Sequence, residues 1–169
     1  MASAPTYTPI ATYTVSSATP TISFTSIPST YTDLVLIIGS ALSATSSKGG
    51  LFTLNSDTGT NYSRTELYGT GSSAGSSRGT NISSSATYIG AITGFDTTNP
   101  ANAILHFMNY SNTATYKTVL GRFTLATQES DATVYLWRST SAINRIDLNL
   151  QSSVNWTAGT FTLYGIVAA

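Results

Sequence analysis

The sequence predicts an all-β protein, an antiparallel β-sandwich of jelly-roll type with about ten strands and an extended N-terminal arm. Three observations predict it. Thr, Ser, Tyr, Val, Ile and Phe dominate the composition, whereas Glu, Lys and Gln, which favour helices, number two each. Apolar residues recur with a period of two, and segments rich in Gly, Ser, Thr and Asn interrupt them at intervals of about 8–12 residues.

Taken in order, the alternating or apolar segments predict these strands: 10–15, 22–27, 33–38, 51–54, 64–68, 82–92, 103–108, 118–124, 134–138, 143–150 and 160–167. Segment 33–38 is almost continuously apolar, which predicts a central strand buried on both faces. Segment 64–68 is expected to pair with 51–54 across a turn-rich connection.

The chain is expected to form one domain over residues 10–169, preceded by an arm over 1–9 that contains Pro5 and Pro9. The Gly- and Ser-rich segment 69–80 has the composition of a linker. We interpret it as a long surface loop, because neither flank is long enough to bury a separate sandwich core. Segment 40–50 is expected to be another such loop.

Charge is scarce: the 169 residues include 7 Lys and Arg and 7 Asp and Glu, where an average chain of this length would carry about 42 charged residues. Seven basic residues and a net charge of zero argue against binding to nucleic acid or to an anionic membrane. A hydrophobic content of 41% argues against disorder. The sequence has no Cys, and its start has neither the charge nor the apolar run of a secretory signal.

Candidates for catalysis are few, and we predict no catalytic, metal-binding or cofactor-binding residues. His106 is the only histidine, no G-x-S-x-G motif is present, and His106 is expected on the less buried face of a strand. A glycosidase needs two carboxylates, for which Glu66, Glu129 and Asp131 are available; Glu129 and Asp131 are expected in a solvated turn.

Two loops resemble ligand sites only weakly. Asp57, Gly59 and Asn61 suggest a calcium loop, but the EF-hand spacing and its terminal Glu are absent. The Gly-rich segment 69–80 has no Gly-Lys pair and is not a phosphate-binding loop.

Aromatic residues are more informative, because Tyr and Trp are enriched at protein interfaces. Tyr7, Ile10 and Tyr13, in or next to the arm, are predicted to contact a neighbouring subunit, although the same residues could simply form the first edge strand. Trp156 is placed in a loop over 151–159, either as a lid on the sandwich or as a contact for a partner or a sugar ring. Trp137 is expected in the core.

Three segments carry a family resemblance: 22–36 (ISFTSIPSTYTDLVL), 54–63 (LNSDTGTNYS) and 159–166 (GTFTLYGI). Together they resemble small β-sandwich virion proteins of tailed bacteriophages, especially phages of aquatic and cyanobacterial hosts. Such proteins decorate and cement capsids or belong to tail fibres and receptor-binding tips. The resemblance implies a virion location, assembly in the host cytoplasm, release by lysis and no catalytic residues.

The sequence therefore favours a non-enzymatic capsid cement protein, a homotrimer that binds the major capsid protein across subunit junctions. The alternative is a tail-fibre or receptor-binding module, attached to tail or baseplate proteins, whose loops 40–50, 69–80 and 151–159 contact host glycans with Trp156 on a sugar. A third hypothesis is a polysaccharide hydrolase that uses Glu66 or Glu129. No nucleic acid, membrane or cofactor is expected.

Overall fold

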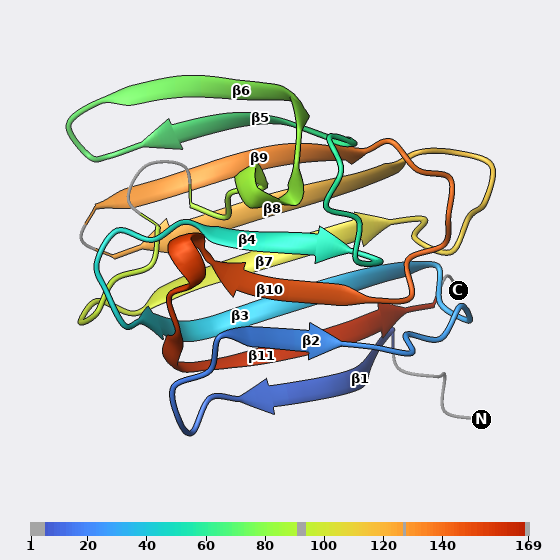
Figure 1. The fold of residues 1–169 in the computed structure, drawn as a ribbon, viewed down its shortest axis with the longest axis horizontal. Helices are drawn as coiled ribbons and strands as arrows, with labels where there is room; N and C mark the ends of the chain where they lie inside the picture. The colour runs from blue at the N-terminus through green and yellow to red at the C-terminus, as the bar shows by residue number, and fades with distance from the viewer. Residues whose placement is uncertain (1–5, 91–93, 127, 168–169) are drawn as a thin grey trace.

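The computed structural model describes residues 6–90, 94–126 and 128–167, and in them eleven strands form two antiparallel sheets (Figure 1). The strands are β1 (Tyr7–Thr14), β2 (Thr21–Phe24), β3 (Asp33–Ser43), β4 (Gly50–Leu54), β5 (Tyr62–Gly69), β6 (Ala74–Ile82), β7 (Ala101–Met108), β8 (Lys117–Leu125), β9 (Glu129–Trp137), β10 (Ile146–Leu150) and β11 (Trp156–Ile166). Two short 3-10 helices, η1 (Ser84–Ala86) and η2 (Gln151–Ser153), complete the described elements.

The two sheets are unequal in size. The large sheet has the order β1-β11-β3-β7-β8-β9-β5-β6, and the small sheet has the order β2-β10-β4. Figure 1 shows the small sheet lying in front of one face of the large sheet, which we call the inner face; the opposite face of the large sheet is the outer face. The predicted antiparallel β-sandwich is confirmed. The jelly-roll connectivity stays a prediction.

Phe52 of β4 links the two sheets. Its ring meets those of Tyr62, Phe107 and Tyr135 edge-on, with centroids 6.3, 6.2 and 4.9 Å away. These three rings come from β5, β7 and β9 of the large sheet, and all are buried. Edge-on pairs of this kind are favourable beyond the area that they bury. Phe52 therefore fixes the small sheet over the middle of the inner face.

The strand predicted over 33–38 is the first half of β3, third in the sheet order and buried mainly on one side. Leu34, Leu36 and Ile38 face the core and are at most 1% exposed. Val35 is also buried, but Ile37 is 38% exposed on the outer face. The prediction of burial on both faces therefore holds for Val35 and is wrong for Ile37.

The segment after β6 covers the part of the inner face that the small sheet does not reach. Thr87 Oγ1 accepts a hydrogen bond from the Phe52 amide and donates to the Phe52 carbonyl, at 3.0 and 2.7 Å. Tyr135 donates its hydroxyl to the carbonyl of Tyr88 at 2.6 Å. The strand predicted over 82–92 is thus wrong: beyond Ile82 the segment forms η1 and an isolated bridge at Ile89, and residues 91–93 lie outside the described residues.

The predicted surface loop over 69–80 is also wrong, because most of it is β6, which forms a hairpin with β5. Glycine lets the Tyr68 ring lie over β6: a Cβ on Gly75 would lie 2.6 Å from the hydroxyl of Tyr68 on β5, so the ring would have to move. The predicted loop over 40–50 is shorter than expected, since its first four residues extend β3.

Strand β4 does not pair with β5, contrary to the prediction. It pairs with β10 in the small sheet, while β5 lies between β9 and β6 in the large sheet. The connection between β4 and β5 crosses from one sheet to the other, and Asn55 and Ser56 turn the chain with φ of 50° and 59°. Such left-handed conformations are most accessible to Gly and to short polar residues. The turn is therefore a crossover and not a hairpin.

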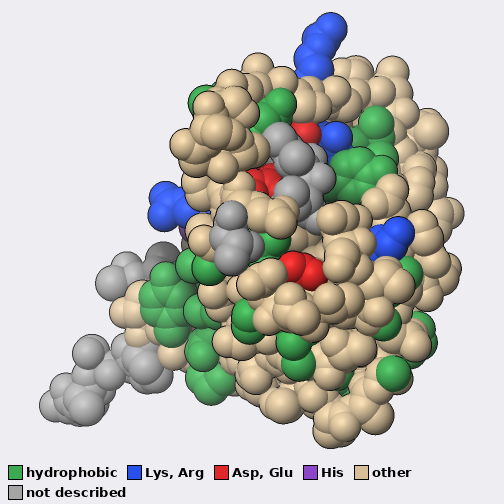
Figure 2. Space-filling model, turned by 90° about the vertical axis from the view of Figure 1, so that its left-hand side faces the viewer, with side chains coloured by type: hydrophobic (Ala, Val, Ile, Leu, Met, Phe, Trp, Pro, Cys, Tyr) green, Lys and Arg blue, Asp and Glu red, His purple; other side chains and the backbone are tan. Residues whose placement is uncertain are grey.

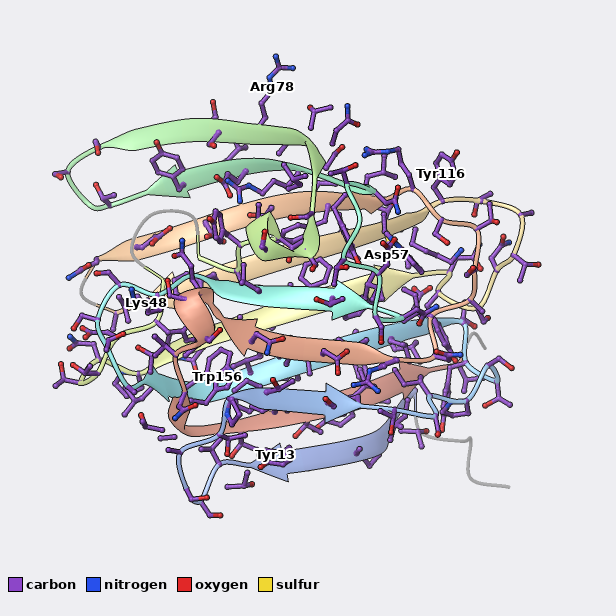
Figure 3. The ribbon with its side chains drawn as sticks, viewed as in Figure 1. Tyr13, Lys48, Asp57, Arg78, Tyr116 and Trp156 are labelled. Atoms are coloured by element: carbon purple, nitrogen blue, oxygen red, sulfur yellow. The ribbon has the colours of Figure 1, made fainter. Side chains whose placement is uncertain are left out.

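The same connection is held by Asp57, which is labelled in Figure 3 and whose carboxylate accepts hydrogen bonds from three residues. It accepts hydrogen bonds from the Trp137 indole at 2.7 Å, from the Asn61 amide at 2.9 Å and from the Gly59 backbone amide at 2.9 Å. Burial raises the pKa of this carboxyl, but the three hydrogen bonds outweigh that effect and hold the pKa below its usual value. The loop thus uses Asp57 to hold Trp137, whose predicted place in the core is confirmed.

No helix in the described ranges is long and apolar enough to span a membrane. The same ranges contain no group of three or more His, Cys, Asp or Glu side chains that could hold a metal ion.

We predict that Asp57→Asn lowers the free energy of unfolding at pH 7 by about 1–3 kcal/mol, the usual contribution of hydrogen bonds to a charged group. Because the folded-state pKa is lowered, this stabilisation is present above the unfolded-state pKa of about 4 and disappears as pH falls through the folded-state value. Urea unfolding from pH 7 to pH 2 measures the difference. Thr60→Ala, an exposed change in the same loop, is the control, and a difference that persists unchanged at pH 2 contradicts the assignment.

Candidate functional site

The outer face of the large sheet presents a band of apolar side chains to solvent. It contains one residue from each of five adjacent strands, with these exposed fractions: Ile37 38%, Ile104 45%, Leu120 40%, Val134 49% and Leu67 62%. Single exposed apolar residues are ordinary on protein surfaces, whereas a contiguous group marks an interaction site. We call these five residues the outer band.

The register of the strands brings the outer band together. Ile37 lies opposite Ile104, and Leu120 lies opposite Val134. Residues opposite each other on one face of a sheet have Cβ atoms about 4.5–5.5 Å apart. Ile104 meets Leu120 diagonally, because its own partner on β8 is Arg122, and Leu67 likewise meets Val134 diagonally. The five side chains therefore form a surface that crosses strands, with the exposed Arg122 beside it.

A hollow of about 360 Å³ lies at one end of the outer band. Its lining consists of Tyr7, Val35, Ile37, Ile104, His106, Leu120 and Arg122. Tyr7 forms one wall, with its ring edge-on to Tyr164 at 6.1 Å between centroids. The floor is Val35, which is only 6% exposed because Tyr164 and His106 flank it in register. None of the strands that the structure describes covers this face.

Few charges border the hollow. His106 Nε2 lies 2.8 Å from Asp33 Oδ2, and the other Asp33 oxygen accepts a hydrogen bond from the backbone amide of Asn109 at 2.6 Å. His106 therefore lies on the less buried face of its strand, as predicted, with Asp33 as its partner. Arg122 is exposed beside Ile104. The hollow can therefore make van der Waals contacts with a bound group through its apolar lining, and its few polar side chains can form hydrogen bonds.

Figure 2 shows how sparse charge is on one end of the molecule. Scattered Lys, Arg, Asp and Glu side chains interrupt a surface that is mostly neither charged nor hydrophobic, with hydrophobic patches among it. The long-range repulsion that keeps highly charged proteins apart is correspondingly weak here.

The predicted interface residues do not form a single surface. Tyr7 is 51% exposed and lines the hollow on the outer face. Ile10 is partly buried against the core. Tyr13 is 40% exposed and lies opposite Phe161, a residue of the inner face; its hydroxyl lies 3.4 Å from the Thr19 hydroxyl. Residues 7–9 of the predicted arm belong to β1, and residues 1–5 lie outside the described residues.

Trp156 is not a surface residue, and its predicted place in a loop is wrong. It begins β11, is fully buried, and packs edge-on against Phe95 and Phe161 at 4.8 and 5.1 Å between centroids (Figure 3). Its backbone pairs with Thr19 through two hydrogen bonds of 2.8 and 3.0 Å. A buried indole between two rings cannot stack on a sugar, so Trp156 is removed from the candidate site.

The acidic residues considered for hydrolysis lie on two neighbouring strands, β5 and β9. The turn predicted for Glu129 and Asp131 is wrong: both belong to β9, and Glu129 is only 5% exposed. Glu66 on β5 lies opposite Thr133, so Asp131 is its diagonal cross-strand neighbour, at about 7–8 Å between backbones.

Glu66 is held as a structural ion pair. It is 1% exposed, and its carboxylate lies 3.4 Å from the Arg64 guanidinium. Arg64 also donates to the Ala86 carbonyl at 2.7 Å and lies over the Tyr88 ring at 4.5 Å. Burial, together with the charges of Asp131 and Glu66, raises the pKa of Tyr135 above its usual value. The Arg64–Glu66 pair thus anchors the segment that covers β5 and β9.

The chain has no match in three comparisons: no protein-family model, no curated protein and no solved structure is similar enough to be assigned.

We predict that Trp156→Ala lowers the free energy of unfolding by about 3–5 kcal/mol, the usual effect of truncating a buried aromatic residue. Trp156→Phe keeps most of the ring contacts and should cost less. Tyr116→Ala, at a residue that is 55% exposed, is the control and should leave stability within about 0.5 kcal/mol. Denaturant unfolding measures all three, and a Trp156→Ala protein of unchanged stability would mean that the indole is not in the core.

Proposed function

We propose that the protein is a non-enzymatic structural protein of a tailed-phage virion, a capsid cement protein that binds the major capsid protein across subunit junctions. The observation that carries this proposal is the outer band, which is apolar and spans five strands. Surfaces with an apolar centre and few charges are typical of protein interfaces. The resemblance of segments 22–36, 54–63 and 159–166 to phage virion proteins supplies the kind of partner.

Binding would work by burial. Each of the five apolar side chains of the outer band contributes about 25 cal/mol for every Å² of apolar surface that it loses to a partner. The hollow beside the band offers a place for one projecting side chain of the partner, and Tyr7 and Leu120 line it. No reaction is required, because cohesion follows from shared buried area.

The alternative is a tail-fibre or receptor-binding module that contacts host glycans. Its main aromatic candidate, Trp156, is buried. Segment 69–80, one of its contact loops, is mostly strand β6. Two of the features that this alternative uses, the Trp156 ring and the loop over 69–80, are therefore not offered to a glycan.

We predict density for this protein on the head of the virion in a particle reconstruction, with its outer face against the capsid shell. Gold labelling of the virion through an epitope tag is an independent measurement of location. Density at the tail tip and none on the head would contradict the cement role.

We further predict that the double variant Ile104→Glu and Leu120→Glu binds capsids lacking the protein at least about tenfold more weakly. Carboxylates are costly to bury in an apolar contact, and Arg122 and His106, which lie opposite these two positions, compensate only part of that cost. Both side chains are at least 40% exposed, so the fold should survive. Thr53→Glu, on the small sheet, is the control that should bind normally. Sedimentation of capsids with bound protein measures the affinities. Equal binding by all three proteins would remove the outer band from the interface.

A further inference from the structure

We propose that β6 pairs antiparallel with β6 of a second copy of this chain, so that two large sheets join edge to edge about a two-fold axis. The pairing goes beyond the virion role, because it follows from the strand edges alone and would stand if the partner in the particle were another protein. The argument compares the four edges of the two sheets within the described residues.

Strand β1, at one edge of the large sheet, carries two features that block pairing. Pro9 lies within it and has no backbone N–H to donate. Its register with β11 shifts between Pro9 and Ala11, so the edge is irregular. Proline and bulges are the usual means by which proteins protect sheet edges.

The small sheet has two edges, and neither is open along a useful length. Strand β2 has four residues. Strand β4 is already occupied on its free side: Phe52 exchanges hydrogen bonds with the Thr87 side chain, and Gly50 exchanges backbone hydrogen bonds with Ile89. These contacts occupy the backbone N–H and C=O groups with which another strand would have to pair.

Strand β6, at the other edge of the large sheet, is less protected. Its one irregularity lies near its end, where the register with β5 shifts between Ile82 and Thr80 and Asn81 has a φ of 56°. The seven residues 74–80 pair regularly with β5, and β6 contains no Pro, Lys, Asp or Glu. Arg78 is its one charged residue, and Figure 3 shows the Arg78 side chain projecting away from the molecule. A long, regular and nearly uncharged edge is a template for another strand.

A second copy fits this edge better than an unrelated peptide. Peptides that add to a sheet edge are selected through pockets for alternate side chains. Strand β6 offers mostly Gly, Ser and Ala, which form no such pockets. Two identical edges are complementary by symmetry, because each strand presents the same donors and acceptors to the other.

A two-fold axis that relates two neighbouring antiparallel strands stands perpendicular to the sheet. Both outer faces of the pair therefore lie on the same side. Leu67 lies on β5, directly beside β6, and is the most exposed member of the outer band at 62%. The pairing therefore places the two outer bands on one continuous surface, and a single partner could bind both bands.

Charge limits the register. Pairing centred on Arg78 would put Arg78 opposite the same residue of the second copy, and like charges directly opposite are unfavourable. Full overlap of the regular residues 74–80 is centred on Ser77 instead and puts Arg78 opposite Ser76, whereas a shift in the other direction puts Arg78 opposite Thr80. Ser76 and Thr80 are both exposed and on the same face as Arg78. A two-fold pair also differs from the homotrimer that the sequence led us to expect.

The test is the mass of the full chain in solution, measured by light scattering after size exclusion, with native mass spectrometry as a second readout. We expect a dimer, twice the 17.7 kDa of one chain. The double variant Ser76→Lys and Thr80→Lys flanks Arg78 with like charge and should lose the dimer. The double variant Ser76→Glu and Thr80→Glu offers Arg78 a carboxylate in either register, so its dimer should persist and weaken as salt is added.

The matched control is Thr12→Lys and Thr14→Lys on β1, which adds the same charge to the opposite edge and should leave the dimer intact. Circular dichroism establishes that each variant is folded. A monomer or trimer for the parent chain would overturn the proposal, as would a dimer that survives Lys at both β6 positions. Loss of the dimer with Glu at both β6 positions would overturn the pairing register. None of these results decides the capsid proposal, which the particle reconstruction and the capsid-binding measurement test separately.

Discussion

The contact of Phe52 with three rings of the large sheet fixes where the small sheet lies, and so which parts of the large sheet other segments must cover. A three-stranded sheet fixed over the middle of an eight-stranded one can cover only one of its faces, and only part of that face. The remainder of the inner face is closed by the segment that contains η1, held through Thr87 and Arg64. Within the described residues nothing closes the outer face, so the apolar side chains of the outer band stay exposed.

The scarcity of charge is more pronounced at the surface than the composition suggests, because several cations are used internally. Lys117 is 1% exposed and donates to the carbonyls of Thr115 and Thr140 at 2.8 and 3.2 Å; burial lowers its pKa. Arg138 donates to the Thr60 carbonyl and to the Ser63 hydroxyl at 2.7 and 2.6 Å. These cations tie loops to the sandwich, which leaves still fewer charges to keep neighbouring molecules apart.

The sequence predicted the strands whose apolar residues alternate, because period two is a local property that burial on one face imposes. It failed at β6, where Gly lets the Tyr68 ring lie over the strand and the alternation vanishes. It failed at Trp156 because the polar segment before it resembles a loop, while burial is decided by Phe95 from a distant part of the chain. The outer band had a signal in the sequence: Ile104 and Leu120 occupy positions that alternation would assign to polar residues.

The two contact surfaces differ in the forces that they use and in their direction. Pairing through β6 lies in the plane of the sheet and uses backbone hydrogen bonds, which depend little on side chains. Contact through the outer band lies perpendicular to that plane and uses apolar area. Because the two surfaces are orthogonal, neither obstructs the other, and one molecule can join a second copy sideways while it lies flat on a partner. The proposed layer over a capsid shell would need both directions, and this sandwich offers both through the outer face of its large sheet and the β6 edge.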